Sequence, residues 1–192
     1  MANVKNFGAK GDGKTNDTEA LQHAVNEIDG VLELPRGDYR ILQPIVVPLQ
    51  RTGFAGIRGD QGTARILMEG PGPALRIVGD HQGTATPATV KEHIWERERF
   101  PVISGFEVQG RHAKADGIQL YRTMQTTIRE VLIRNCRHGI HLKERNRNFL
   151  LAQCHIYDNS DTGVFFDKCN LHQVIIIGNH ISYCKRAGIR QL

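Results

Sequence analysis

Short stretches in which every second residue is apolar recur along the second half of the chain at an almost constant interval. They begin at Gly117, Gly139, Gly163 and Gly188, which are separated by 22, 24 and 25 residues. A second alternating stretch precedes each of the last three glycines, as in His155-Ile156 before Gly163. One such unit cannot bury two short apolar strands alone, so we expect the units to stack on one another.

The stacking that this pattern predicts is a parallel β-helix, an all-β solenoid. The units are rich in Ile and Val and are interrupted by Gly, Asn and Asp, which indicates strands joined by tight turns rather than helical or leucine-rich repeats. Equivalent residues of successive coils should then lie about 4.8 Å apart, the usual strand spacing. Cys136, Asn159 and Cys184 each follow an isoleucine by three residues, so we expect them to form one ladder, without a disulfide.

The N-terminal segment, residues 1–30, has a different pattern. Within residues 17–28 the apolar positions fall on one stripe, which predicts an amphipathic α-helix that stops at Gly30 and caps the first coil. Short strands are expected from there to residue 78. Residues 79–101 are charged, include the single tryptophan and break the pattern, so they are expected to form an insertion loop, either a groove wall or a solvated loop.

Residues 1–192 are expected to form a single β-helix domain. Its last strand, from Gly188, reaches Leu192 with no capping helix or polar coil after it, although an open solenoid end needs such a cover. We therefore expect C-terminal coils to be missing and the chain to be a fragment of a longer protein. The alternative is an oligomer partner that covers this end.

Composition narrows the range of partners. The net charge is +5 and the Lys and Arg residues are scattered, which mildly favours anionic partners. The sequence has neither the Cys/His spacing of a zinc finger nor a basic helix, so no motif indicates nucleic-acid binding. No signal peptide and no apolar stretch of membrane-spanning length occurs, so we expect no membrane partner, and the native compartment stays open.

The beginning of the chain resembles a known superfamily. The similarity lies in VKNFGAKGDGKTNDT, residues 4–18, and LPRGDY, residues 34–39, which are typical of the N-terminus of pectate-lyase-like proteins. This group contains polygalacturonases, polysaccharide lyases, alginate epimerases and phage tailspike depolymerases. The resemblance implies a right-handed, single-stranded parallel β-helix that acts on polysaccharides, and it makes a secreted or cell-surface location plausible.

Alternation along the repeats predicts which side chains point outward. If the apolar residues of each stretch face the interior, one exterior groove is lined by Tyr121, His141, Lys143, Asp167 and Arg190. Such a set could bind and process a glycan. It could equally be an ordinary solvated face, because the outside of any β-helix must be polar.

Two aspartates are candidates for hydrolysis. Polygalacturonases carry catalytic aspartates just before such strands, and Asp116 matches the first of these positions. One coil later, where that family has paired carboxylates, this chain has Arg137-His138-Gly139, and the next coil offers Asp161. Inverting hydrolysis needs two carboxyl groups about 6.5–9.5 Å apart. The spacing of two coils leaves that separation open, but the family's own arrangement is absent.

A lyase or epimerase needs a base beside a uronate carboxylate and cations to neutralise that carboxylate. His141 is the candidate base, Lys143 the catalytic cation, and Tyr121, Asp167 and Arg190 the substrate-binding residues. The epimerases' Asp-Pro-His-Glu element and the lyases' calcium-binding acids are missing, so no metal or other cofactor is expected. Three aspartates, 158, 161 and 167, could supply a few calcium ligands, but such residues more often serve turns.

The sequence therefore predicts a protein that binds a polysaccharide, possibly an acidic one, and degrades or modifies it as a lyase, hydrolase or epimerase. Two alternatives remain open. One is a non-catalytic carbohydrate-binding or surface module, and the other is a tailspike-like receptor-binding protein, which would be a trimer rather than a monomer.

Overall fold

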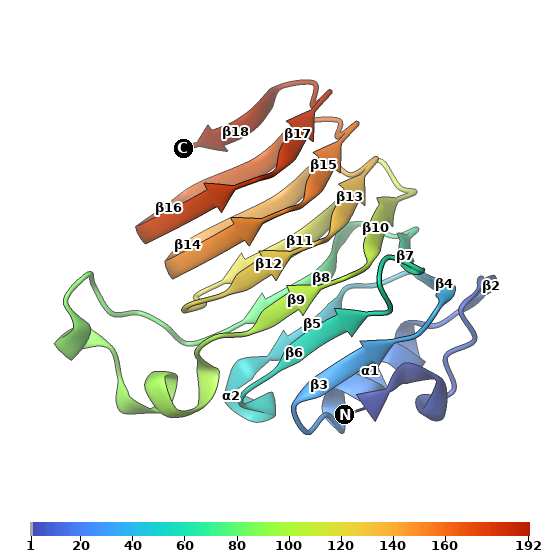
Figure 1. Ribbon diagram of the computed structural model, residues 1–192, viewed down its shortest axis with the longest axis horizontal. Coiled ribbons are helices and arrows are strands. Elements are labelled where there is room, and N and C mark those ends of the chain that lie inside the picture. Colours follow the sequence, from blue (N-terminus) through green and yellow to red (C-terminus); the bar gives the residue numbers. More distant parts are fainter. Residues whose placement is uncertain (1) are drawn as a thin grey trace.

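The computed structural model describes residues 2–192, and in it the chain winds into a stack of parallel coils (Figure 1). The larger sheet contains β1 (Ala2–Asn3), β3 (Val31–Leu34), β5 (Ile45–Pro48), β6 (Gly56–Gly59), β8 (Gly72–Val78), β9 (Val102–Ser104), β11 (Ala115–Tyr121), β12 (Thr127–Arg129), β14 (His138–Ala152), β16 (Thr162–Ile177) and β18 (Ala187–Gln191). The smaller sheet contains β2 (Asp12–Asn16), β4 (Gly37–Ile41), β7 (Ala64–Met68), β10 (Glu107–Gly110), β13 (Leu132–Arg134), β15 (His155–Tyr157) and β17 (His180–Ser182). Neighbouring strands in both sheets pair in parallel, which confirms the predicted β-helix.

The glycine repeat has a steric cause. A Cβ atom on Gly117 would lie 2.2 Å from the carbonyl oxygen of Gly139, and one on Gly139 would lie 2.6 Å from that of Gly163. The same contact recurs at the next step, where a Cβ on Gly163 would lie 2.6 Å from the oxygen of Gly188. Successive coils therefore approach too closely at this column for any side chain, which makes the repeat readable in the sequence.

The predicted ladders are confirmed. Ile133 pairs with Ile156, and Ile156 pairs with Ile181. Three residues further on, the backbone N–H of Cys136 donates to Asn159 Oδ1 at 3.0 Å, and Asn159 Nδ2 lies 3.8 Å from Cys184 Sγ. All four cysteines are free thiols.

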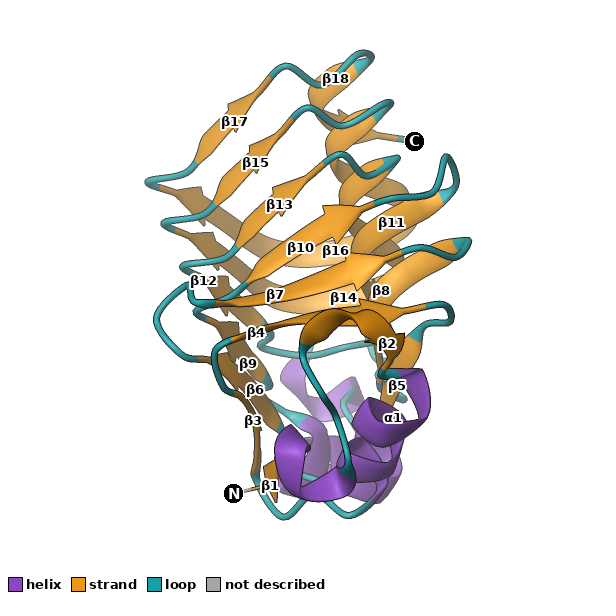
Figure 2. Ribbon diagram, turned by 90° about the vertical axis from the view of Figure 1, so that its right-hand side faces the viewer, coloured by secondary structure: helices purple, strands orange, loops and turns teal. Residues whose placement is uncertain are grey.

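Helices gather at the N-terminal end of the stack (Figure 2). The main one, α1 (Thr18–Asn26), is shorter than the predicted 17–28, with Asp17 and Glu27 as its flanking residues. The Asp17 side chain accepts hydrogen bonds from the backbone of Lys10 and Gly11 at 2.7 and 3.0 Å. The buried face of α1 belongs to the same hydrophobic core as the coils. A short helix, α2 (Leu49–Thr52), follows β5. No helix among residues 2–192 has the length and apolar character needed to cross a membrane.

Residues 79–101 form a loop between β8 and β9 that projects to one side of the stack (Figure 1). It contains a short 3-10 turn, Pro87–Thr89, and a single π-helical turn, Ile94–Glu98, so its helical content is smaller than its composition suggests. Val90 and Ile94 pack against Met124, and Trp95 is partly buried beside them. The loop is thus docked on the coils.

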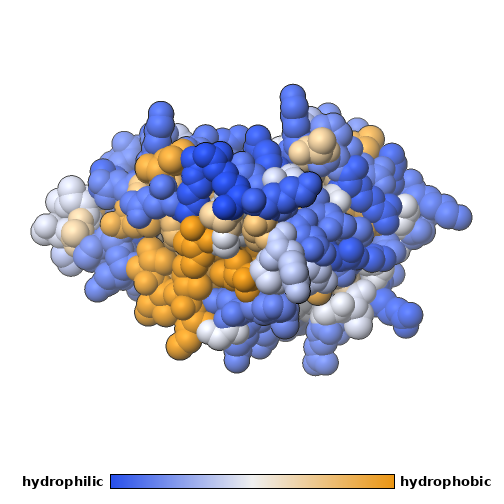
Figure 3. Space-filling model, turned by 90° about the horizontal axis from the view of Figure 1, so that it is seen from above, coloured by the Kyte–Doolittle hydropathy of each residue, from blue (hydrophilic) through white to orange (hydrophobic). Residues whose placement is uncertain are grey.

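The C-terminal coil is less covered than the others. Seen from that end, apolar side chains gather over one part of the surface (Figure 3). Exposed large apolar residues in the last two coils are Ile175, Ile177, Ile189 and Leu192. The interior columns further down the stack, by contrast, are fully buried.

Candidate active site

The candidate residues lie on one exterior surface, here called the site face: the outward side of β8, β11 and β18, with residues 138–143 of β14 and 162–167 of β16. Register places Gln119, His141, Phe165 and Arg190 in one column. Tyr121, Lys143 and Asp167 form the adjacent column. The alternating residues between them, such as Ile140 and Leu142, are fully buried in the core. The predicted register of the two columns is therefore present in the fold.

His141 is held on both sides of its ring. Nε2 lies 3.0 Å from Asp167 Oδ2, and Nδ1 lies 3.4 Å from Gln119 Nε2. Because the Gln119 amide nitrogen can only donate, Nδ1 carries the lone pair and Nε2–H donates to Asp167. The imidazole is only 5% exposed, and burial, partly offset by Asp167 and Asp116, lowers its pKa. His141 is therefore neutral at pH 7 and has its basic atom at Nδ1.

Asp167 links His141 to Lys143. Its Oδ2 atom lies 3.3 Å from Lys143 Nζ as well as 3.0 Å from His141 Nε2. Burial alone would raise the pKa of Asp167, but the hydrogen bonds from His141 and Lys143 outweigh it, so the pKa is lowered. A carboxylate in this position orients the imidazole and would stabilise it if Nδ1 took up a proton.

Asp116 lies beneath the site face and is 1% exposed. Arg137 donates to both of its oxygens, at 2.9 and 2.6 Å, and the backbone N–H of His138 donates to it at 3.2 Å. The hydrogen bonds with Asp116 raise the pKa of Arg137, against the effect of its own burial. Asp116 is thus engaged in holding Arg137 at the site, a different arrangement from the solvent-accessible acid that hydrolysis needs.

Asp161 is separate from that pair. It accepts a hydrogen bond from Thr162 Oγ1 at 2.7 Å, and Arg186 Nη1 lies 4.0 Å away. The structure thus gives the two carboxylates predicted for hydrolysis different partners. Asp158, in turn, has a φ of 54° at a corner of its coil, in keeping with a role in the turn.

His138 is a member of the site that the sequence analysis did not single out. It is 6% exposed, its Nδ1 atom is buried without a hydrogen-bond partner, and its ring lies 5.2 Å from that of His141. Burial lowers its pKa. Its position in Arg137-His138-Gly139, immediately before a repeat glycine, was the available signal. Strict alternation would have placed His138 on the interior side with Ile140, and only its ring contacts with His141 and Phe165 show that it belongs to the site.

Aromatic and cationic groups complete the site face. Phe165 stacks on His141 with ring centroids 5.1 Å apart, and the Arg190 guanidinium lies 5.0 Å above the Phe165 ring. Tyr121 has two arginines at its ring, Arg76 at 5.7 Å and Arg122 at 5.0 Å. The arrangement presents a neutral histidine among several cations, a setting that suits an anionic substrate.

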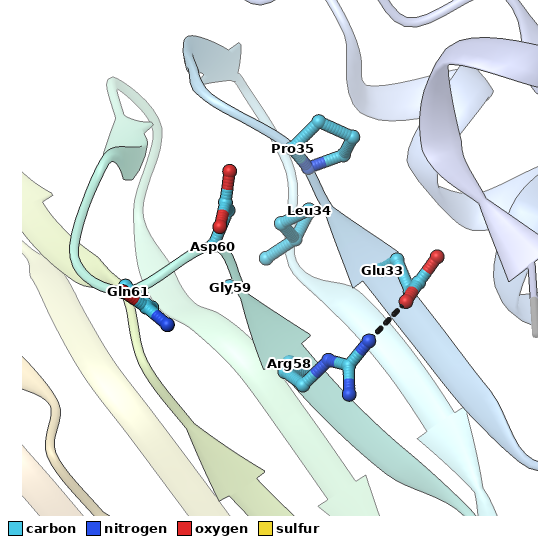
Figure 4. A pocket seen from close by; sticks show the side chains of 7 residues that line it. All are labelled: Glu33, Leu34, Pro35, Arg58, Gly59, Asp60 and Gln61. Atoms are coloured by element: carbon cyan, nitrogen blue, oxygen red, sulfur yellow. Dashed lines mark hydrogen bonds and ion pairs between the residues drawn. The ribbon is translucent and has the colours of Figure 1, made fainter.

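No cluster of three or more His, Cys, Asp or Glu residues that could hold a metal ion occurs within residues 2–192. A hollow of about 440 Å³ lies at another corner, around the ends of β3 and β6 (Figure 4). Its charged side chains include the ion pair of Glu33 with Arg58. It contains no histidine, so we place the candidate chemistry on the site face.

Comparison with known proteins gives two family matches. Residues 93–191 match the family described as right handed beta helix region, and residues 1–70 match the one described as rhamnogalacturonase A/epimerase, pectate lyase-like. A curated relative, alginate lyase 7 of Azotobacter vinelandii, is 54% identical over 43 residues, which make up 20% of this chain and 5% of that protein.

Solved structures share the fold. The A-module of mannuronan C-5 epimerase AlgE4 from Azotobacter vinelandii superimposes with a TM-score of 0.73 at 19% identity, over 98% of this chain and 53% of that one. ORF18 of Geobacillus virus E2 gives a TM-score of 0.61 at 17% identity, over 89% and 42% of the two chains. Tailspike protein 2 of bacteriophage CBA120 gives 0.59 at 14% identity, over 93% and 30%. The chain thus spans about half, or less, of the length of these structures.

Proposed function

Because the chain belongs to the right-handed β-helix family, whose coils present side chains in fixed columns, we propose that it binds an anionic polysaccharide along the site face and modifies it there. The similar proteins include an alginate lyase and a mannuronan epimerase, which supports a uronate polymer as the substrate class. The net charge of +5 and the arginines around Tyr121 and Phe165 favour the same class.

The observation that carries the proposal is that Asp167 contacts both His141 and Lys143. In the proposed step, Nδ1 of His141 removes the proton from the sugar carbon next to the carboxylate. Asp167 stabilises the imidazolium that forms, and Lys143 neutralises charge that develops on the substrate carboxylate. Gln119 must release Nδ1 first, and its long contact of 3.4 Å is compatible with that release.

Two outcomes follow from this carbanion-like state. In a lyase, the electron pair of the broken C–H bond forms a C4–C5 double bond while the C4–O glycosidic bond breaks and its oxygen takes up a proton. In an epimerase, a proton returns to the opposite face of the same carbon and no bond of the chain is broken. Both begin with the same proton transfer to His141, so one experiment tests both.

That experiment is to incubate polygalacturonate and alginate with the chain in D2O. The unsaturated product is followed by absorbance, and deuterium at C5 is followed by NMR. We expect His141→Ala to lower either signal by about 10²–10⁴-fold, the usual contribution of a general base. His155→Ala, which removes an exposed histidine on β15, is the matched control and should leave the rate unchanged.

Equal rates for His141→Ala and the wild type would remove His141 from the mechanism. New reducing ends without unsaturation or deuterium would indicate hydrolysis and return attention to Asp116 and Asp161.

A second candidate function is carbohydrate binding without catalysis. It is favoured by the 5% exposure of His141, whose two ring nitrogens both have partners in the structure. In that case the polymers bind, but neither signal appears. A tailspike-like protein would in addition be a trimer, which light scattering measures directly.

A further inference from the structure

A positively charged pocket lies between the 79–101 loop and the turns of later coils. Arg145 Nη1 donates to the carbonyl oxygen of Gly83 at 2.8 Å. Arg147 Nη1 donates to those of Thr84 and Ala85 at 2.6 and 2.8 Å. Both arginines belong to β14, so one strand fastens a loop that precedes it by more than 60 residues. Neither guanidinium forms an ion pair with a carboxylate anywhere in residues 2–192.

One of the two guanidinium groups, that of Arg147, is buried. Arg147 is 6% exposed, and its Nε–H has no hydrogen-bond partner. His81, below the same loop segment, is 1% exposed, and its Nδ1 also lacks a partner. Burial first, and then the charges of Arg147 and Arg145, lower the pKa of His81 to about 4. Because buried charges are normally paired, a buried guanidinium with only carbonyl partners is incomplete.

An opening of about 30 Å³ is available beside His81 and Arg145, while Arg147 lies behind the loop backbone that it binds and does not line the opening. Its lining includes His81, Arg145, Asn170 and His172, together with the loop backbone at 83–85, and contains no acidic residue. A space of this size holds about two water molecules. It therefore has room for a carboxylate group, whereas a sugar ring would have to remain outside.

We infer that this pocket is an anion subsite that takes the carboxylate of a uronic acid unit. Arg145 follows Lys143 by two residues on β14, with a register irregularity of the ladder between them. A polymer held at Lys143 would thus present a neighbouring carboxylate toward Arg145. The choice of a uronate as ligand rests on the proposed function, whereas the charge and the opening are properties of the pocket itself.

The test follows the ring ¹⁵N resonances of His81 and His172, which line the opening, in the ¹⁵N-labelled chain at fixed pH and ionic strength. The probes are sodium acetate, sodium galacturonate and, as a neutral control, glucose. We expect saturable shifts with acetate and galacturonate and none with glucose. Arg145→Gln should weaken binding by about tenfold or more, because it removes a charge-assisted contact. The matched control is Arg129→Gln, an exposed arginine paired with Glu130 at 2.9 Å, which should bind like the wild type.

The absence of a saturable shift in the wild type would overturn the proposal, and this measurement needs no variant to fold. Equal affinities of Arg145→Gln and the wild type would overturn it as well. Sodium sulfate distinguishes the source of the anion: binding as tight as that of galacturonate would indicate a general site for free inorganic anions and overturn the uronate assignment. His141→Ala separates the two proposals, because it should abolish uronate chemistry while leaving the shifts of His81 and His172 intact.

Discussion

The site face and the seven-stranded face, meaning the outward side of the smaller sheet, are built from the same coils but handle charge differently. On the seven-stranded face, charges pair between neighbouring coils near the solvent: Arg65 with Asp38 at 2.8 Å, and Arg134 with Glu107 at 2.8 Å. Glu69 joins two arginines, Arg40 and Arg111, in the same way. Such pairs are typical of the solvent-exposed surface of a solenoid, where each charge is paired with an opposite charge and remains hydrated.

The site face instead buries titratable groups. Asp116, His138 and His141 are exposed by 1%, 6% and 5%, and His138 keeps an unpartnered nitrogen. Burial of such groups opposes folding and is not needed for coils to stack, as the seven-stranded face demonstrates. Polar side chains on the outside of a β-helix therefore do not by themselves indicate a functional site. Buried ionisable groups do, because they distinguish a candidate site from an exterior surface that only interacts with solvent.

The largest expected effect contrasts Asp116→Asn with Asp38→Asn. The first removes a buried carboxylate that accepts hydrogen bonds from Arg137 and from the His138 N–H, and it should lower the free energy of unfolding by about 2 kcal/mol. The second breaks a half-exposed pair and should cost less than about 1 kcal/mol. Urea unfolding at pH 7 measures both. Equal losses would mean that the two faces do not differ in the way proposed.

The pH dependence of stability should come from buried histidines. His81 has a pKa of about 4 in the folded chain, below the ordinary 6.5, so the unfolded chain binds more protons between these values. Stability is therefore complete above pH 6.5 and falls as the pH decreases toward 4. From His81 alone we expect a loss of about 2 kcal/mol between pH 7.5 and pH 5.

His81→Gln should flatten this dependence, as measured by urea unfolding at the two pH values. The variant His155→Ala, which removes an exposed histidine on the seven-stranded face, should leave the slope unchanged. A slope that persists in His81→Gln would place its origin in other groups.

The smallest effect concerns binding. Lys143→Ala should weaken the binding of polygalacturonate about threefold to tenfold at low salt, and the difference should shrink as salt rises, because the lysine acts through charge. Arg134→Ala removes one positive charge from the seven-stranded face and is the matched control. Calorimetric titration measures both. Equal weakening would show that the polymer responds only to net charge.

The stacking of the coils was predictable because it has a local cause in the sequence. At Gly117, Gly139 and Gly163 the backbone of the next coil excludes a side chain, so a glycine marks each of these three coils. Alternation from these glycines then gave the columns that contain His141 and Lys143 in their true register. Where the backbone leaves no room for a side chain, a glycine is needed, and that glycine can be recognised in a single sequence.

Some corners of the coils are marked by Asn or Asp, as at Asn135 and Asp158, but others are not recognisable from the sequence. Glu144 and Lys168 occupy the left-handed region, with φ of 65° and 46°, as do Gln125 and Gln153 at 56°. Glu, Lys and Gln rarely adopt this conformation, so they do not predict it in a sequence as Gly or Asn would. The fold imposes it on them through the hydrogen bonds of neighbouring coils, which sequence patterns do not contain.

The burial of the site residues could not be predicted from the sequence either. Alternation assigned His141 and Gln119 to the exterior, but it could not tell that neighbouring side chains such as Phe165 cover them. The pairing of Arg137 with Asp116 joins residues 21 positions apart, and the contacts of Arg145 and Arg147 with the loop join residues more than 60 apart. Only the three-dimensional arrangement brings these groups together.

The bond between β14 and the 79–86 segment also bears on how the solenoid comes apart. In a stack where each coil touches only its neighbours, unfolding can run from an end one coil at a time. Within residues 2–192 the last coils, with exposed Ile177 and Ile189, have the least buried surface. Arg145 and Arg147 fasten the coil of β14 to a loop that begins two coils earlier, so unravelling that passes β16 must release several coils at once. The loop therefore couples the coils from β8 to β14, so that they should unfold as one cooperative unit.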